Sequence, residues 1–268
     1  MKIISVRLVT AALAIVMLSL GLTAQADTLD DIKKAGKIRV AIDTAIPPFG
    51  MTDDKLQPTG SDVDVARLLA KDLGVELEIV TTTGPTRIPM LQTNKTDIVV
   101  STLSITPDRA KVIDFTTPYA DHPSVVGGLK SLAIKDLSDL DGKKVAVVRG
   151  TTQDTDLTQK AKGAQLVRYE DDATMALAVA SGQVDILATA RSLLPAISKK
   201  NPARTLEPKI TMQTNYLAIG VRKEEPKLLA WLNDWVKANL RNGKLAAIYK
   251  QYHGIDIPTQ ELLSKAGS

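Results

Sequence analysis

Short apolar runs along the chain alternate with segments in which apolar residues recur at helical spacing. The runs indicate buried strands, at 37–42, 75–80, 97–100, 144–148, 164–169, 184–188 and 216–221. A helical stripe lies between the first two, where Val65, Leu68, Leu69 and Leu73 precede Gly74. Further helices are expected at 87–92, at 172–181, from Pro226 to Asn242, and at 244–252. Strands separated by helical crossovers predict an α/β fold with largely parallel sheets.

Two helix features allow sharper predictions. Ser61 is followed three residues later by Asp64, a spacing typical of a capping box at a helix start. Trp231 and Trp235 lie four residues apart on the helix that Pro226 opens. They could stack on a ligand, but this spacing on an amphipathic helix favours packing in the core.

The N-terminal segment has the pattern of a secretory signal. Lys2 and Arg7 precede an apolar run at 8–22, and the small-residue site Ala24-Gln25-Ala26 follows. We therefore expect residues 1–26 to be a signal peptide cleaved after Ala26, and the mature chain to lie in the periplasm. A membrane anchor is the alternative, but the apolar run is short for one. The chain has no Cys, so neither disulfides nor a lipid anchor on cysteine is expected.

The remaining segment, 27–268, is long for one domain and suits two of about 120 residues. The formal charge of +4 falls to +2 without Lys2 and Arg7, since the segment 1–26 has no acidic residue. This charge, without a basic stripe interleaved with aromatics, argues against nucleic acid as a partner.

The residue types argue against several kinds of chemistry. The chain has only two histidines, His122 and His253, so the usual zinc ligand sets are missing and no metal is expected. No phosphate-binding GxxxxGK[ST] loop, GxGxxG turn or nucleophile elbow is present, and no cofactor is expected. The composition favours a protein that binds a molecule without transforming it.

The stretch STLSITPDRA, at 101–110, follows an apolar strand. Thr106 can cap a helix that begins at Pro107, with Arg109 in its first turn. Hydroxyls, free helix N–H groups and a guanidinium together favour a carboxylate site at the carboxyl end of a parallel strand. The alternative is a capped turn with Arg109 paired to a surface carboxylate.

The stretch VRGTTQD, at 148–154, repeats this arrangement. An apolar strand leads into Gly150, and Thr151 and Thr152 stand at the start of a helix. Taken alone, this is an ordinary capped turn. Two such turns, one in each predicted domain, suggest a ligand held between the domains.

These residues resemble the extracytoplasmic solute-binding proteins of the polar amino-acid ABC importers. The resemblance covers most of 27–268. It is carried by TLDDIKKAGKIRVAID, PPFG, GSDVDVARLLAKDLGVELEIV, TRIPMLQTNKTDIVVSTLSITPDRAKVIDFTTPY, DLDGKKVAVVRGTT, SGQVDIL, LAIGVRK and LAAIYKQYHG. It implies a two-lobe clamshell, the type II periplasmic-binding-protein fold, with two crossing strands as hinge. Lobe one would be 27–123 plus 217–268, and lobe two 124–216.

The same resemblance assigns roles to residues of the cleft. It implies that Arg109 binds the α-carboxylate of a ligand. It also implies supporting contacts from Ser101, Thr102 and Ser104 in lobe one and from Thr151 and Thr152 in lobe two, and a cleft-facing acid at Asp43.

The chain departs from the family pattern at the other end of the ligand. Ala190 stands where the family has the acidic residue that binds the amino group, just after a strand. Ile46 and Ser61 stand where the family tends to have aromatic residues. Without the acid, a ligand ammonium would lack a charged partner, which costs several kcal/mol in a buried site.

Two explanations stay open. Either Asp43 or Asp62 replaces the missing acid, or the ligand is an organic acid, an opine or another modified amino acid. Asp185 matches a family acid that looks structural. Arg87 matches a family arginine and is expected to support the cleft wall. Arg191 could add a positive group, although an exposed helix-start arginine is the simpler interpretation.

The resemblance implies a periplasmic receptor, expected to be a monomer, that delivers a small carboxylate-bearing solute to an ABC permease in the inner membrane. Closure of the hinge around the solute gives the permease a shape to recognise. The alternative is an enzyme on the same scaffold, such as a cyclohexadienyl dehydratase, with Asp43 or His122 as the acid. A sensory receptor is a third possibility.

Overall fold

The computed structural model describes residues 27–265, which form two five-stranded sheets and the helices around them. The first sheet has the order β4-β1-β5-β12-β6. Its strands are β1 (Lys37–Ile42), β4 (Glu76–Thr81), β5 (Ile98–Val99), β6 (Ile113–Phe115) and β12 (Gly220–Arg222). The helices that accompany it are α2 (Thr28–Ala35), α3 (Ser61–Leu73), α4 (Arg87–Gln92), α5 (Pro107–Ala110), α9 (Pro226–Arg241), α10 (Lys244–His253) and α11 (Thr259–Ser264). A small hairpin, β2 (Met51–Thr52) with β3 (Pro58–Thr59), lies beside them.

The second sheet has the order β11-β7-β10-β8-β9. Its strands are β7 (Ala120–Leu129), β8 (Lys144–Val148), β9 (Gln165–Tyr169), β10 (Ile186–Ala190) and β11 (Leu206–Leu217). The helices α6 (Thr152–Lys160), α7 (Asp172–Ala180) and α8 (Leu193–Lys200) pack on it, with the short 3₁₀ turns Leu137–Leu140 and Pro202–Arg204.

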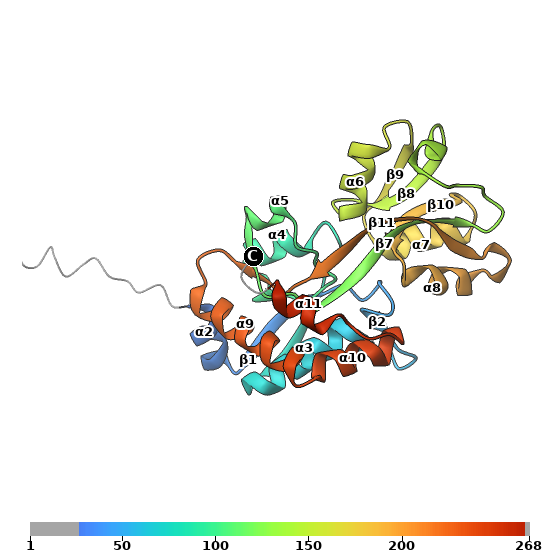
Figure 1. Ribbon diagram of the computed structural model, residues 1–268. Coiled ribbons are helices and arrows are strands. Elements are labelled where there is room, and N and C mark those ends of the chain that lie inside the picture. The colour runs from blue at the N-terminus through green and yellow to red at the C-terminus, as the bar shows by residue number, and fades with distance from the viewer. Residues whose placement is uncertain (1–26, 266–268) are drawn as a thin grey trace, which may run out of the picture.

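Each sheet belongs to one of two lobes, and two long strands join the lobes (Figure 1). We call the lobe with the first sheet lobe one and the other lobe two. Strands β7 and β11 pair antiparallel from Leu129 with Leu206 to Ala120 with Leu217, and they run from one lobe to the other. The predicted clamshell with two crossing strands is confirmed. The chain thus enters and leaves lobe two through extended strands.

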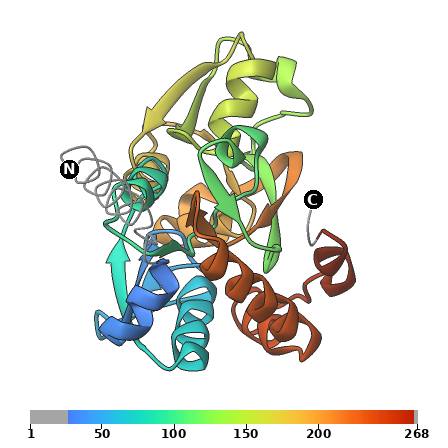
Figure 2. The ribbon, with the colours of Figure 1, turned by 90° about the vertical axis from the view of Figure 1, so that its left-hand side faces the viewer.

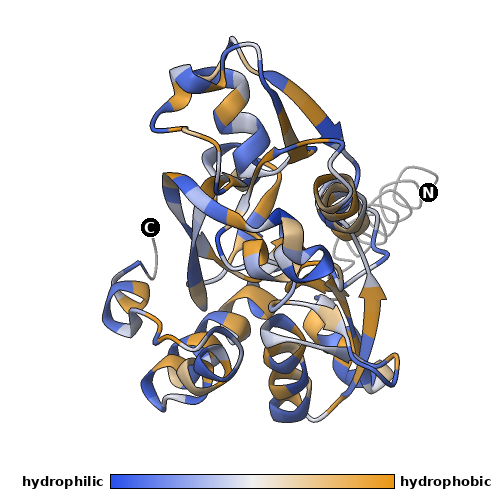
Figure 3. Cartoon of the chain, turned by 90° about the vertical axis from the view of Figure 1, so that its right-hand side faces the viewer, coloured by the Kyte–Doolittle hydropathy of each residue, from blue (hydrophilic) through white to orange (hydrophobic). Residues whose placement is uncertain are grey.

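Lobe one is built from both ends of the described chain. Figure 2 shows the blue N-terminal elements beside the red C-terminal helices in the same lobe. Apolar residues of α3, α9 and α10 pack on the first sheet, with Leu69, Leu232 and Leu245 all buried. The helices carry apolar and polar residues in alternation (Figure 3), as helices that cover a sheet on one side do.

The tryptophan prediction is confirmed. Trp235 is buried in the core of lobe one, and Trp231 packs against the same core. The indole Nε1 of Trp235 donates a hydrogen bond of 2.8 Å to Asp72 Oδ2 on α3, which ties α9 to α3. The pair is therefore structural.

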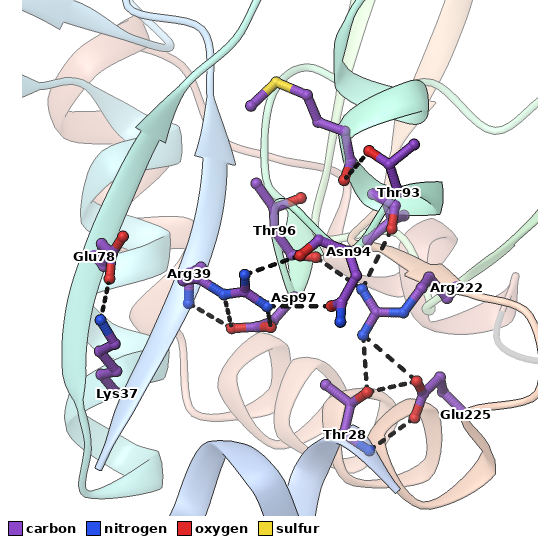
Figure 4. Close-up of polar contacts among 12 residues, drawn as sticks. Thr28, Lys37, Arg39, Glu78, Thr93, Asn94, Thr96, Asp97, Arg222 and Glu225 are labelled. Carbon is purple, nitrogen blue, oxygen red and sulfur yellow. Dashed lines mark hydrogen bonds and ion pairs between the residues drawn. The ribbon is translucent and has the colours of Figure 1, made fainter. Parts of the chain in front are cut away.

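Polar side chains form hydrogen bonds and ion pairs at one end of the first sheet, opposite the carboxyl ends of its parallel strands (Figure 4). Arg39 on β1 forms an ion pair of 2.6 Å with Asp97. Arg222 on β12 donates to the carbonyl of Thr96 at 2.8 Å and to Thr28 Oγ1 at 2.8 Å. These bonds join α2, β1 and β12. The lobe-one residues of the predicted site lie at the other end of the sheet, after the carboxyl ends of the parallel strands.

Three sequence-based details are wrong. Gly60, with φ 126°, is the N-cap of α3, and Ser61 is the first helical residue, whose Oγ lies 3.1 Å from His253 Nε2. Ala190 is the last residue of β10 and does not follow it. The run 216–221 is no single strand, because β11 ends at Leu217 and β12 begins at Gly220. The run is largely apolar, so its pattern does not reveal where the hinge strand ends and the strand of the first sheet begins.

The predicted signal peptide, 1–26, lies outside the described residues. Within 27–265, no helix combines the length and the apolar character that crossing a bilayer requires.

Candidate functional site

A small cavity that is open to solvent lies where the two lobes face each other. Among the predicted site residues, Thr102, Ser104, Thr151, Thr152 and Ala190 line it. The other lining residues are Ile46, Gly84, Arg87, His122, Val148, Gln153, Asp172, Ala188 and Thr189. Asp43, Ser101 and Arg109 are not among the lining residues, although Arg109 is hydrogen-bonded to the lining residue Ser104 and Ser101 precedes Thr102. The two sequence stretches that suggested a shared site therefore do meet at one cavity.

Hydrogen bonds join the segment that follows β5 to other parts of lobe one and so form one wall of the cavity. Ser101 Oγ accepts from the backbone N–H of Asp43 at 3.0 Å, and the carbonyl of Ser101 accepts from an Arg87 Nη at 2.6 Å. Thr102 adopts a left-handed conformation, φ 44°, which is uncommon for a β-branched residue. Its N–H donates to Asp62 Oδ2 at 2.7 Å, and this hydrogen bond holds the strained turn in place.

Asp62 is bonded within lobe one. Its second oxygen, Oδ1, accepts from the hydroxyl of Tyr119 at 2.8 Å. Burial raises the pKa of Asp62 to about 6, although both hydrogen bonds act to lower that pKa. Both oxygens are thus used, and Asp62 does not line the cavity. Its contacts are those of a residue that shapes the wall.

Arg109 bridges the lobes at the rim of the cavity. As predicted, Thr106 caps α5, accepting from the N–H of Arg109 at 3.2 Å, with Pro107 as the first helical residue. The guanidinium donates to the carbonyl of Ser104 at 2.9 Å and to the carbonyl of Gly150 in lobe two at 3.1 Å. Burial, together with the charge of Arg87, lowers the pKa of Arg109 to about 9, which leaves it positively charged at neutral pH.

No carboxylate within residues 27–265 forms an ion pair with Arg109. The alternative in which Arg109 pairs with a surface carboxylate therefore has no support in this structure. A guanidinium has five N–H donors, and two of those of Arg109 are used by carbonyls. The others remain for an anion.

The lobe-two wall begins at the start of α6. Thr151 is the N-cap, and its Oγ1 accepts from the N–H of Asp154 at 3.2 Å and donates to the carbonyl of Val148 at 2.7 Å. Thr152 and Gln153 follow in the first turn and line the cavity. The amide of Gln153 donates to Ser124 Oγ on β7 at 2.9 Å, which links this wall to the hinge.

The lobes touch beside this turn. A Cβ placed on Gly84 of lobe one would lie 3.0 Å from Val148 Cγ1 and 3.6 Å from Thr151 Cγ2 of lobe two. Together with the Arg109–Gly150 bond, this contact shows that the structure has the lobes closed on each other.

Gln153, Asp172 and Thr189, which line the cavity, were not singled out from the sequence. Arg87 was named only as a support of the wall and His122 only as an acid of the alternative enzyme, and both line the cavity. His122 is buried and edge-on to Phe49, and burial lowers the pKa of its imidazole to about 4, so it is neutral. The two acids at the start of α7, Asp171 and Asp172, are a helix-start signal, and that signal does not reveal which of them lines the cavity.

Asp172 is the acid that faces the cavity. It is 5% exposed, and no other described residue forms a hydrogen bond or ion pair with its carboxylate. Burial, and next the negative charge of Asp43, raise the pKa of Asp172 to about 7, while Arg87 acts to lower it. The neighbouring Asp171 does the capping, since its Oδ1 accepts from the N–H of Thr174 at 2.7 Å.

Arg87 and Asp43 are also buried without complete partners. Arg87 is 4% exposed, and its Nε has no hydrogen-bond partner in residues 27–265. Oδ2 of Asp43 is likewise unpartnered there, whereas Oδ1 accepts from the N–H of Ala45 at 2.9 Å. Burial lowers the pKa of Arg87 and raises the pKa of Asp43. Buried charges are normally paired, so this arrangement marks a functional site.

The described residues contain no group of three or more His, Asp or Glu side chains that could hold a metal ion. The cavity and the groups beside it comprise hydroxyls, backbone groups, two arginines and two acids, Asp43 and Asp172. Such a set can bind a small polar molecule that carries both charges.

Residues 38–255 match the family described as bacterial extracellular solute-binding proteins, family 3. The chain belongs to this family. It is 29% identical over 237 residues to the L-cystine-binding protein TcyJ of Escherichia coli, covering 85% of this chain and 87% of that protein.

Two solved structures show the same fold. One is a solute receptor for L-cysteine from Neisseria gonorrhoeae, with a TM-score of 0.79 and 30% identity, covering 84% of this chain and 93% of that chain. The other is an ancestral amino acid-binding protein described as a precursor of cyclohexadienyl dehydratase, with a TM-score of 0.77 and 36% identity, covering 84% and 99%.

In this family-3 chain the departure at Ala190 is placed directly on the cavity. Ala190 is 6% exposed and lines the lobe-two wall at the end of β10. Ile46 lines the opposite wall, whereas Ser61 lies away from the cavity. Two secondary expectations are confirmed: Asp185 forms an ion pair with Arg204, and Arg191 is exposed.

Proposed function

We propose that this protein is the receptor of an ABC importer, which binds an amino acid or a related small carboxylate between its lobes and presents it to a permease. One observation carries the proposal. A cavity lined by both lobes brings a cationic lobe-one wall against the capped start of α6, and two hinge strands connect the walls. TcyJ and the Neisseria receptor are named for binding L-cystine and L-cysteine, which supports this solute class.

The mechanism follows from the contacts. A carboxylate at the rim would accept hydrogen bonds from Arg109, the hydroxyls of Thr102 and Ser104, and the first turn of α6. Because these donors come from both lobes, a bound solute stabilises the closed form, and a permease can distinguish that form from the open one. We further propose that the receptor acts as a monomer in the periplasm, after removal of residues 1–26.

A thermal-shift screen over a broad panel of solutes tests the proposal. The panel contains the twenty common L-amino acids, L-cystine, opines and small organic acids. A solute that binds only the folded protein raises the midpoint of unfolding as its concentration rises above Kd. We expect at least one carboxylate to do so, with calorimetry giving one site per chain. If no carboxylate in the panel binds, the proposal fails.

A second candidate function, a dehydratase, is favoured by one observation. Asp172 is a cavity acid with a pKa of about 7, in the range useful for proton transfer, and one similar structure is described as a precursor of cyclohexadienyl dehydratase. Incubation with prephenate and with arogenate tests it. Sustained product formation that Asp172→Asn abolishes would establish the enzyme, whereas binding without turnover leaves the receptor.

A further inference from the structure

Three buried charged groups in or beside the cavity each have a polar atom without a hydrogen-bond partner in residues 27–265, although Arg87 and Asp43 also have one bonded atom each. They are Asp172 on α7 of lobe two, and Asp43 and Arg87 in lobe one. The charges of Asp43 and Arg87 both act on Asp172, so all three lie close together. No ion pair nevertheless joins them within residues 27–265, and two of them, Arg87 and Asp172, line the cavity.

We infer that Asp172 accepts the ammonium group of the bound solute, in place of an acid at the end of β10. The inference rests on the proposed function. It assigns the solute to the amino acids and other ammonium carboxylates, and it makes Asp172 a specificity-determining residue.

Asp172 suits this role better than the other acids. It lines the cavity, whereas Asp62 has both oxygens bonded and Asp43 has one oxygen on the Ala45 N–H, and neither lines the cavity. Its own helix does not need it, because Asp171 supplies the N-cap. An ammonium group donates to up to three acceptors and removes the cost of a buried, unpaired carboxylate.

The two lobes contribute groups that suit opposite charges of one molecule. Arg109 and the hydroxyls of Thr102 and Ser104 can bind a carboxylate from lobe one, and Asp172 faces them from lobe two. Ala190, which lines the same cavity, has no polar group that could bind the ammonium in place of Asp172. A molecule with both charges would therefore satisfy groups of both lobes at once.

Calorimetry with matched pairs of compounds tests the inference. Each of the twenty common L-amino acids and L-cystine is titrated beside its 2-hydroxy-acid analogue, which keeps the carboxylate and lacks the ammonium. We expect the wild-type protein to prefer the amino compound. Asp172→Asn should weaken its binding by about 30-fold or more and that of the hydroxy acid by less than about threefold. Asp171→Asn is the matched control, and its affinities should equal those of the wild type.

Each outcome separates this inference from the proposed function. If Asp172→Asn weakens both compounds equally, or neither, the inference is wrong. Should the wild type bind only acids without an amino group, the inference is wrong and the receptor proposal stands. If nothing with a carboxylate binds, both are wrong.

A second variant distinguishes loss of the ammonium partner in Asp172→Asn from damage to the structure of the cavity. Asp172→Asn combined with Ala190→Asp returns a carboxylate to the same wall from β10. Recovery of the preference for the amino compound, by about tenfold or more, supports an ammonium site at this wall. A double variant that binds both compounds equally would contradict it.

Discussion

Two buried acids, one in each lobe, differ in how they are bonded. In lobe one, Asp62 accepts from Tyr119 and from Thr102, so this acid has its partners before a solute arrives. In lobe two, Asp172 is also buried, yet no hydrogen bond from the rest of the described chain reaches its carboxylate. Arg87 Nε and Asp43 Oδ2 of lobe one are likewise unpartnered there, so the groups left for a solute come from both lobes, whereas Asp62 shapes lobe one without one.

The largest expected effect on solute affinity concerns the anion end. Arg109→Ala removes the charged donor at the rim and the contact with the Gly150 carbonyl, so solute affinity should fall by about 100-fold or more, while the protein still folds. Calorimetry on the screened solute measures this. Arg191→Ala, at an exposed arginine in lobe two, is the control and should bind normally. An Arg109→Ala protein with wild-type affinity would show that the carboxylate binds elsewhere.

The next effect concerns the unpaired acid. The pKa of Asp172 in the folded protein, about 7, lies above its ordinary value of 3.8. The folded state therefore holds a proton that the unfolded state releases, and stability is lost as the pH rises from about 4 to about 7. Asp172→Asn should remove this loss in the solute-free protein.

Urea unfolding of the wild type and of Asp172→Asn, at pH 4 and at pH 8, checks the sign. The advantage of the variant should be small at pH 4 and about 4 kcal/mol at pH 8. An advantage that does not change with pH would mean that Asp172 is already satisfied in the absence of solute.

Asp62 provides the opposite case. Asp62→Ala leaves the Tyr119 hydroxyl and the Thr102 N–H buried without an acceptor, so the free energy of unfolding should fall by about 2 kcal/mol at pH 7. The exposed Asp54→Ala should change it by less than about 0.5 kcal/mol. If the two variants are equally stable, the hydrogen bonds that Asp62 accepts from Tyr119 and Thr102 do not stabilise lobe one.

The smallest effect concerns the contact between the walls. Gly84→Ala places a methyl group 3.0 Å from Val148 Cγ1, which a few tenths of an ångström of opening would relieve. We expect solute affinity to fall about fivefold, with the stability of the solute-free protein unchanged. Calorimetry on the screened solute measures the affinity. An unchanged affinity would show that Gly84 and Val148 do not approach each other in the solute-bound form.

Much of the framework could be predicted from the sequence because it depends on local signals. Helix starts at Pro226 and Thr106 were predictable, since proline and a hydroxyl cap act within one turn. The capping box at Ser61 failed for a tertiary reason. A Cβ at Gly60 would lie 2.3 Å from the carbonyl oxygen of Phe49, so close packing decides which residue stands at the helix start.

The site itself was half predictable. The turns at 101–110 and 148–154 carry caps and hydroxyls that a sequence displays, and the structure places them on one cavity. Asp172 could not be singled out, because Asp171 and Asp172 are equivalent as helix-start acids. Only the packing of α7 against the second sheet decides that Asp171 caps and Asp172 faces the other lobe.

The most direct test of the account is a crystal structure grown with the tightest-binding solute of the panel, in which the distance from the solute nitrogen to the Asp172 carboxylate is measured. We predict a hydrogen bond of about 2.7–3.2 Å there, with the solute carboxylate on Arg109 at the rim. A solute bound outside the cavity, or one whose nitrogen contacts Asp43 and lies beyond about 4 Å from Asp172, would contradict the account.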